Sequence, residues 1–312
     1  MPGRGARGRR GAGRGAGGDT GAGGDTGAGV RTAVITVAHG RHGHLRRQQE
    51  GLAAVERPPE VRIVVALDDP QVADVVDDRV PTRTVPVTSD GRGLPLARAR
   101  NTGARAALAA GARLLVFLDV DCIPGPALFR RYREAARTAG TRLLCGPVAY
   151  LPPPPPGGYR AEALATSAAP HPARPAPPDG TCVEADDHTL FWSLSFAVTA
   201  STWARFGGFH EGYHGYGAED TDLGQQARAR GIGLCWVGGA TAYHQHHPVS
   251  DPPVEHLDDI LRNGALFRRR WGWWPMTGWL ERFAAEGLVR HDAPDDRWER
   301  VWDGARAGTA RS

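Results

Sequence analysis

Residues 113–121 read Arg-Leu-Leu-Val-Phe-Leu-Asp-Val-Asp, an apolar run that ends abruptly in two carboxylates. The consecutive apolar side chains from Leu114 to Leu118 predict a strand that is buried on both faces, which is typical of parallel sheets in α/β proteins. In open α/β sheets, ligands bind beyond the carboxyl ends of the strands. The segment therefore predicts an α/β fold and places Asp119 and Asp121 at a ligand-binding edge.

The sequence upstream of this segment repeats the alternation of strand and helix. Apolar runs predict strands over 33–37, 61–67 and 84–87. The intervening polar or Ala/Arg-rich stretches predict helices, one extending to Leu52 and one over 96–110 that ends at Gly111. This order predicts a mostly parallel sheet flanked by helices. Asp68 and Asp69 follow the second strand as Asp119 and Asp121 follow the later one.

The downstream half continues the same pattern after an interruption rich in proline. A helix is predicted around 127–139, and the prolines between 152 and 180 predict an extended surface loop. Further strands are predicted over 191–199 and 232–237, with an acidic turn at 212–222 that leads into a helix ending at Arg230. We expect one catalytic domain over 30–250 and a helical C-terminal extension over 251–312.

Composition and charge limit the class of protein. Residues 1–29 are almost entirely Gly, Ala, Arg, Asp and Thr, so they have little to bury and are predicted to be disordered. This segment carries five arginines and two aspartates, and without it the formal charge of +4 falls to about +1. The predicted domain is nearly neutral, which gives no support to a nucleic-acid partner.

Cysteine spacing and hydropathy bear on the cellular location. The four cysteines are widely spaced and form no Cys-x-x-Cys pair, so we expect reduced thiols and no zinc site. The sequence has neither an apolar run long enough for a transmembrane segment nor an apolar signal sequence at its start. We therefore expect a cytoplasmic protein, with peripheral association at a membrane left open.

Two acidic clusters and one histidine cluster are candidates for the active site. Asp119 and Asp121 form an Asp-x-Asp pair that suits a hard divalent cation, Mn²⁺ or Mg²⁺, bridged to a diphosphate. Glu219, Asp220 and Asp222 crowd the first turn of a predicted helix, where N-capping alone needs only one such residue. His244, His246 and His247 follow the last predicted strand, and an imidazole from this cluster can complete the metal site.

These motifs, taken in order, resemble those of known glycosyltransferases. The strand at 34–36, Asp68-Asp69, the run Ala97-Arg98-Ala99-Arg100-Asn101-Thr102-Gly103 and Asp119-Val120-Asp121 resemble the nucleotide-binding half of family 2 enzymes of the GT-A fold. The segments 191–196, 206–209 and 215–222 resemble the carboxyl-terminal part of β-1,4-galactosyltransferases and polypeptide N-acetylgalactosaminyltransferases. Tyr216 stands where the galactosyltransferases carry tryptophan, and Ala218 replaces a glycine. The resemblance covers about residues 32–270.

The resemblance implies a role for each matching residue. Asp68 or Asp69 would hydrogen-bond the nucleotide base, Asp119 would face the ribose or the donor sugar, and Asp121 would bind the metal with His244, His246 being the alternative. Glu219 would hold sugar hydroxyls, with Asp220 as the general base. We also assign Arg98, Asn101 and Trp192 to the nucleotide-sugar site. There Arg98, or Arg100 as the alternative, would assist the departure of the nucleoside diphosphate, and Trp192 offers a stacking face.

The predicted activity is metal-dependent transfer of a hexose or N-acetylhexosamine, with inversion, from a nucleotide diphosphate sugar to a hydroxyl acceptor. UDP is the expected nucleotide, and the acceptor class (glycan, lipid, peptide or small molecule) is open. A sugar nucleotidyltransferase is one alternative, but the loop at 39–43 lacks the basic glycine-rich pattern that it would need. A non-catalytic sugar-nucleotide-binding or scaffold protein is the other, and it would not need Asp121, Glu219 and Asp220.

Overall fold

A central sheet of eight strands, in the order β3-β2-β1-β4-β10-β6-β11-β9, organises the molecule. The computed structural model describes residues 30–302, so the predicted disordered tail over 1–29 lies outside the described residues. Four neighbouring strands run parallel: β3 (Thr82–Val87), β2 (Val61–Leu67), β1 (Thr32–Ala38) and β4 (Leu114–Leu118). The predicted α/β architecture with a mostly parallel sheet is confirmed.

The other half of the sheet mixes strand directions. β10 (Ser195–Thr199) pairs antiparallel with both β4 and β6 (Arg142–Cys145), β11 (Gly233–Val237) runs parallel to β6, and β9 (Cys182–Ala185) closes the edge antiparallel to β11. The predicted strand over 191–199 starts only at Ser195, because residues 191–194 form a loop after a short 3-10 helix, η2 (His188–Leu190). Phe191 contributed to the apolar pattern that predicted the strand, but its side chain packs against Phe196 in the core from the loop.

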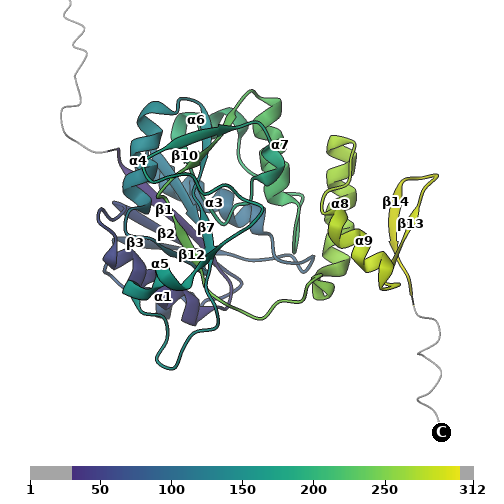
Figure 1. Cartoon of the computed structure of the whole chain (residues 1–312), viewed down its shortest axis with the longest axis horizontal. Coiled ribbons are helices and arrows are strands. Elements are labelled where there is room, and N and C mark those ends of the chain that lie inside the picture. Colours follow the sequence, from purple (N-terminus) through teal and green to yellow (C-terminus); the bar gives the residue numbers. More distant parts are fainter. Residues whose placement is uncertain (1–29, 303–312) are drawn as a thin grey trace, which may run out of the picture.

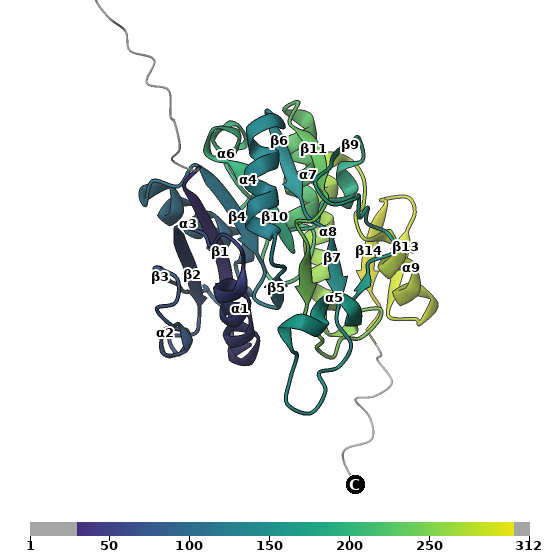
Figure 2. The same ribbon diagram turned by 60° about the vertical axis from the view of Figure 1, so that its left-hand side comes forward.

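Helices cover both faces of this sheet (Figures 1 and 2). One core contains Ile35 and Phe117 and packs against α3 (Leu96–Ala109), α6 (Ala200–Phe206) and α7 (Glu219–Ala229). The other contains Val34 and Val116 and packs against α1 (His42–Ala54) and α4 (Leu128–Thr138). Adjacent residues of one strand serve opposite cores because strand side chains alternate between faces. A short helix, α2 (Val72–Val75), follows β2.

A glycine lets α3 lie close against the sheet. A Cβ added to Gly103 would lie 2.4 Å from Cγ2 of Ile35, closer than packed carbon atoms can approach. The near contact between α3 and β1 therefore requires glycine at this position. This contact fixes the distance between α3 and the sheet, and with it the position of Arg100, which lies one turn earlier on the same helix.

A second, smaller sheet with the order β5-β12-β7-β8 lies beyond the end of β4. Its strands are β5 (Cys122–Pro124), β12 (Ala242–His244), β7 (Val148–Tyr150) and β8 (Ala169–Pro170). The strands β6 to β9 are short and were not predicted from the sequence. The stretch 152–180, predicted as an extended surface loop, contains η1 (Ala161–Ala163), α5 (Leu164–Ser167) and β8.

The C-terminal segment packs as a separate layer beside α7, drawn in yellow-green and yellow in Figure 1. It contains η3 (Val254–His256), α8 (Leu257–Trp271), α9 (Thr277–Ala285) and a hairpin of β13 (Val289–Asp292) and β14 (Arg297–Arg300). The expectation of a wholly helical extension is therefore wrong for 289–300. The hairpin forms because Val289 and Trp298 pack against the apolar faces of α8 and α9, contacts that local helix patterning does not reveal.

The cysteines differ from the expectation of four reduced thiols. Cys182 of β9 and Cys235 of the neighbouring β11 form a disulfide, and their Cα atoms lie 6.0 Å apart. They are 53 positions apart in the chain, so the local spacing of the cysteines could not predict this disulfide. Cys122 and Cys145 are free and buried. Over residues 30–302, no helix is both long enough and apolar enough to cross a membrane.

Candidate active site

A cavity of about 690 Å³ lies where the carboxyl end of β4 meets the start of α7 and the C-terminal segment. Its lining includes four residues singled out from the sequence: Asp119, Trp192, Glu219 and Asp220. These residues come from widely separated parts of the chain, so the fold gathers most of the acidic motif residues around one space.

Arg100 joins the two acidic motifs at the base of this cavity. Its Nη1 donates a hydrogen bond of 2.9 Å to Oε1 of Glu219, and its Nη2 donates one of 3.2 Å to Oδ1 of Asp119. All three are largely shielded from solvent, so the pairing is screened far less than on the surface. Oε2 of Glu219 is buried and has no hydrogen-bond partner among the described residues, which leaves it available to a ligand.

The carboxyl groups of the cavity have shifted proton affinities. Burial raises the pKa of Asp119 to about 7, although the Arg100 guanidinium opposes the shift. Burial also raises the pKa of Asp220 to about 6, and the neighbouring Glu219 carboxylate adds to the effect. A carboxyl group with a pKa near 6 holds a proton more firmly than an ordinary aspartate, as suits a group that exchanges protons near neutral pH.

Asp121, His244 and His247 form a second group, with one ligand atom from each lying within 4.8 Å of the others. Nε2 of His244 and Nε2 of His247 each lie 3.5 Å from a carboxylate oxygen of Asp121. The small sheet creates this proximity, because its register pairs His244 with Cys122, the residue after Asp121. His246, the reserve ligand from the sequence, is exposed and lies outside the group.

The charges within this group influence one another. Burial acts to raise the pKa of Asp121, but the hydrogen bond from His247 and the two imidazoles hold it below its usual value. Burial lowers the pKa of His244. The group thus favours an ionised carboxylate next to a neutral imidazole, the forms in which both side chains bind metals.

The aspartates after β2 lie away from the cavity lining. Asp69 is occupied by the protein itself, since it accepts hydrogen bonds of 2.8 Å from the Gly40 backbone and from the His42 imidazole. Asp68 is exposed, adopts a φ of 48°, and accepts a bond of 2.8 Å from the Ser89 backbone. Of the two, Asp68 keeps more of its hydrogen-bonding capacity for a nucleotide base.

Arg98 and Asn101 do not line the cavity either. Arg98 donates to the carbonyl of Thr88. The Asn101 amide donates to the Phe209 carbonyl and accepts from the Phe209 backbone N–H, both at 2.9 Å. Asn101 thus ties α3 to the Gly207-Gly208-Phe209 turn and positions Arg100 on the same helix. The arginine in the cavity is Arg100, which the sequence offered as the alternative to Arg98.

Several aromatic residues complete the lining. Trp192 contacts His171 edge-to-face, with ring centroids 4.9 Å apart, and the Arg174 guanidinium lies 5.4 Å from the centroid of one Trp192 ring. His171 comes from the proline-rich segment, which is therefore part of the site. Trp273 and Trp279 of the C-terminal segment also line the cavity. The sequence places Trp271, Trp273, Trp274 and Trp279 close together, but no local pattern indicates which of these rings borders a cavity.

Three residues of the motif Gly215 to Asp222 adopt a left-handed backbone conformation. Gly215 and Gly217 have φ values of 72° and 91°, and Ala218 also adopts a left-handed φ of 74°. A left-handed φ favours glycine, so the alanine at 218 occupies a position for which glycine is the less strained residue. This turn directs Glu219 and Asp220 into the cavity at the start of α7.

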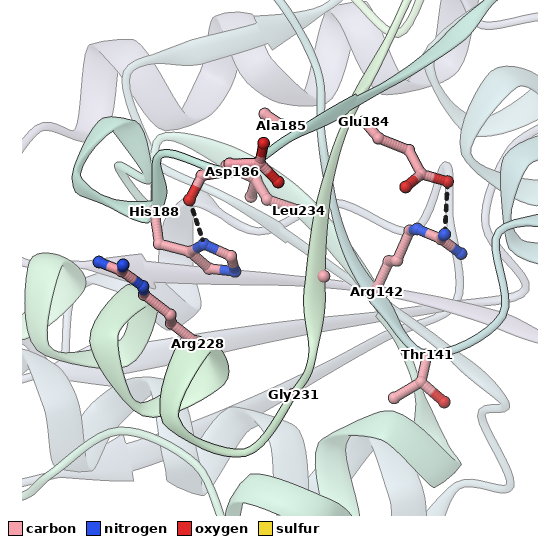
Figure 3. A pocket seen from close by; sticks show the side chains of 10 residues that line it. Thr141, Arg142, Glu184, Ala185, Asp186, His188, Arg228, Gly231 and Leu234 are labelled. Carbon is pink, nitrogen blue, oxygen red and sulfur yellow. Dashed lines mark hydrogen bonds and ion pairs between the residues drawn. The ribbon is translucent and has the colours of Figure 1, made fainter.

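A second pocket of about 450 Å³ lies at the amino-terminal ends of β6 and β11, which begin at Arg142 and Gly233 (Figure 3). Its prominent side chains already have protein partners. Arg142 is paired with Glu184, and Nδ1 of His188 lies 3.1 Å from the Asp186 carbonyl (Figure 3). None of the residues predicted for the active site lines this pocket, so the cavity at the end of β4 is the better candidate.

Comparisons with known proteins agree with the motifs. Residues 187–248 match the family model described as the N-terminal domain of galactosyltransferase. Validoxylamine A glucosyltransferase of Streptomyces hygroscopicus subsp. limoneus is 31% identical over 223 residues, and the enzyme of subsp. jinggangensis is 32% identical over 213. The matches cover 64% and 61% of this chain, which spans about half the length (48%) of each relative.

Solved structures share the fold at low sequence identity. TarS of S. aureus in complex with UDP-GlcNAc aligns with a TM-score of 0.54 and 11% identity, covering 81% of this chain and 76% of TarS. GalNAc-T7 with UDP, GalNAc and Mn²⁺ aligns with a TM-score of 0.51 and 13% identity, covering 83% and 58%. The predicted resemblance is thereby confirmed: the chain has the GT-A fold and is related in sequence to glycosyltransferases.

Proposed function

We propose that this protein transfers a hexose or N-acetylhexosamine from a UDP-linked sugar to a hydroxyl acceptor, with inversion and with the help of a divalent metal ion. The arrangement of Asp119, Glu219 and Asp220 around one cavity carries the proposal. Asp119 belongs to the same loop as Asp121, so the metal-ligand group adjoins the acidic cavity. The sequence relationship to glucosyltransferases makes glucose the first sugar to test.

Asp220 is the proposed general base. An inverting transfer needs a group that takes the proton of the acceptor hydroxyl as its oxygen attacks the anomeric carbon and the bond to the diphosphate breaks. Asp220 lines the cavity, and its pKa of about 6 leaves the carboxylate ionised at neutral pH while making it more basic than an exposed aspartate. These properties fit the role.

Glu219 and Arg100 are proposed to position the sugar. Oε1 of Glu219 is fixed by Arg100, and the unpartnered Oε2 can accept a hydrogen bond from a sugar hydroxyl. A buried carboxylate oxygen without a partner is costly, and a ligand hydroxyl removes that cost on binding. Asp119, held by the same arginine, would accept from the ribose or the donor sugar.

The residues Asp121, His244 and His247 fit a divalent cation. Their ligand atoms are close enough to converge on one ion, and a carboxylate with two imidazoles suits a first-row transition ion such as Mn²⁺ better than the oxygen-seeking Mg²⁺. The second imidazole of this group belongs to His247, whereas the sequence offered His246 only as the alternative to His244. A bound cation would stabilise the negative charge that develops on the leaving nucleoside diphosphate.

A donor screen tests the proposal. The protein is incubated with UDP-, GDP- and dTDP-sugars and Mn²⁺, with and without EDTA, and release of the nucleoside diphosphate is followed. We expect release from a UDP-hexose and its loss in EDTA. When a hydroxyl acceptor is added, we expect a β-linked product from an α-linked donor in the NMR spectrum. Absence of release from every donor contradicts the proposal, and release that persists in EDTA removes the metal from it.

A separate assay tests the nucleotidyltransferase alternative. A nucleotidyltransferase would form pyrophosphate from UTP and a sugar 1-phosphate, a reaction that the proposed mechanism does not include. We expect no pyrophosphate with glucose 1-phosphate, galactose 1-phosphate or N-acetylglucosamine 1-phosphate.

A further inference from the structure

One side of the cavity is an aromatic wall formed by Tyr216, Trp273 and Trp279. Pro275, Met276 and Gly278 from the C-terminal segment lie beside it in the lining. Trp273 and Trp279 fall outside residues 187–248, the part that matches the galactosyltransferase family model. The C-terminal segment therefore contributes a surface to the cavity that the family match does not explain.

The three rings are held by the protein and are not loose surface side chains. Trp273 is 38% exposed, and its ring meets the buried Phe267 edge-to-face at 4.6 Å. Tyr216 is 37% exposed and stacks on His256 with ring centroids 4.4 Å apart and an interplanar angle of 9°. Trp279 lies 5.9 Å from Tyr216. Each ring is thus supported by another ring while it borders the cavity.

Polar contacts fix this wall to the helix that carries Asp220. The Asn263 side chain of α8 donates hydrogen bonds of 3.0 to 3.1 Å to the carbonyls of His214, Tyr216 and Gly217. Nε of Arg270 and Nε1 of Trp271 donate bonds of 2.6 and 2.7 Å to Asp222 on α7. The position of the aromatic wall relative to Asp220 is therefore set by buried contacts.

The lining of the cavity combines charged and aromatic side chains. Asp119 and Arg100 lie on the side that continues to Asp121 and the imidazoles, where the proposed mechanism places the diphosphate. Trp273 and Trp279 of the aromatic wall belong to the C-terminal segment, and the wall lines the same cavity as Asp220. In an inverting reaction the acceptor oxygen enters opposite the leaving group, so the surface that does not hold the diphosphate is the surface available to the acceptor.

The charge of the lining restricts what the acceptor can be. Arg100 is the only arginine among the described residues that line the cavity, and Glu219 and Asp119 already neutralise it. An acceptor carrying phosphate or carboxylate would face Glu219 and Asp220, and the lining contains no unpaired arginine to balance its charge. A neutral acceptor that combines an apolar face with hydroxyl groups matches both the rings and the carboxylates.

We infer that Trp273 and Trp279 bind the acceptor and that this acceptor is a neutral sugar ring. The C–H face of a pyranose packs on an aromatic ring, while its hydroxyl groups remain free to reach Asp220. This inference rests on the proposed function for the role of Asp220, but the binding of a sugar ring to the two tryptophans is measurable by itself.

The test compares Trp273→Ala and Trp279→Ala with the wild-type protein and with Trp302→Ala. Trp302 is a matched control because it is 78% exposed and does not line the cavity. The acceptors are the methyl β-glycosides of glucose, galactose and N-acetylglucosamine, disaccharides ending in the same sugars, and a serine-containing peptide. The donor is the UDP-sugar that the wild type cleaves, and its hydrolysis in the absence of acceptor is measured for each variant.

We expect the acceptor KM to rise about tenfold in each alanine variant, the effect of losing one stacking contact. The KM for donor hydrolysis should stay unchanged, and any fall in Tm from the lost packing should be recovered in the phenylalanine variants. Trp273→Phe and Trp279→Phe should recover most of the acceptor affinity, and Trp302→Ala should behave as wild type. A preference for disaccharides over methyl glycosides would identify the end of a longer glycan as the source of the ring.

The inference is overturned if the alanine variants keep the wild-type acceptor KM, or if transfer occurs only to the peptide. Should the wild type cleave no donor, the proposed function fails, and binding of the glycosides is then measured by quenching of tryptophan fluorescence. Glycoside binding that the alanine variants lose supports the sugar-ring site. An absence of binding to the wild type, or equal binding by the alanine variants, refutes it.

Discussion

Arg100 donates a hydrogen bond of 2.9 Å to Glu219, a residue 119 positions later in the chain. Its second terminal nitrogen contacts Asp119 at 3.2 Å, so one guanidinium links the carboxyl end of β4 to the start of α7. Helix α3 can present this arginine because Gly103 allows close packing on β1. The ion pair is thus both a structural connection and part of the candidate site.

Removing Arg100 should therefore reduce both stability and activity. Arg100→Met leaves two buried carboxylates without their cation, and we expect a loss of about 3–5 kcal/mol in the free energy of unfolding, measured by urea denaturation. Arg92→Met is the matched control, because the pair between Arg92 and Asp90 is exposed and its loss should change little. Equal stability of the two variants would contradict the structural role of Arg100.

Asp220→Asn should abolish most of the transfer. The amide cannot take a proton, and loss of a general base lowers kcat by about 10²- to 10⁴-fold. The KM for the donor and the Tm should change little, since burial disfavours the charged form that the substitution removes. Initial rates with saturating donor measure the effect. A kcat within threefold of wild type would exclude Asp220 as the base.

The pH dependence of kcat/KM should show the ionisation of Asp220. Its pKa is raised to about 6, and only the ionised form can act as a base. Activity should rise with pH up to about 6 and level off above it, with a slope of one on a logarithmic plot below the pKa. The effect on stability has the opposite sign. A raised aspartate pKa stabilises the folded state below about pH 4, and this contribution is lost as the pH rises through 6.

The histidines near residue 245 allow a matched test of the metal site. His244→Ala and His247→Ala each remove an imidazole of the group around Asp121, and we expect Mn²⁺ affinity to fall at least about tenfold. His246→Ala is the control, because that side chain is exposed and outside the group. Titration calorimetry with Mn²⁺ distinguishes the variants. If only His246→Ala binds Mn²⁺ more weakly than the wild type, His246 is a metal ligand and the assignment of His244 and His247 is wrong.

Asp222→Asn should loosen the C-terminal segment from α7. Asp222 is fully buried and accepts hydrogen bonds from Tyr213, Gln226, Arg270 and Trp271. The amide leaves Arg270 without its anion, which we expect to cost about 2–4 kcal/mol of unfolding free energy. Urea denaturation measures the loss, and faster proteolysis between α7 and α8 should accompany it. Asp258→Asn, an exposed residue of α8 paired with Arg300, should change neither.

The sequence by itself determined two parts of the protein: the parallel half of the large sheet, in which Asp119 follows β4, and the acidic start of α7. Buried parallel strands such as β1, β2 and β4 are continuous apolar runs, and this local pattern is enough to identify them. The motif from Gly215 to Asp222 could also be identified from the sequence, because its glycines and acidic residues lie in one continuous segment. The short strands β6, β7 and β9 and the hairpin after α9 were missed because their pairing partners, not their own residues, stabilise them.

Only the tertiary structure decided which side chains meet. The register between β5 and β12 brings His244 to Asp121 and leaves His246 outside, although all three histidines look alike in the sequence. The packing of α3 places Arg100, and not Arg98, in the cavity lining. The packing of the C-terminal segment adds Trp273 and Trp279 to the same lining. A ligand site depends on distances between atoms that are far apart along the chain, and those distances are fixed by sheet register and helix packing.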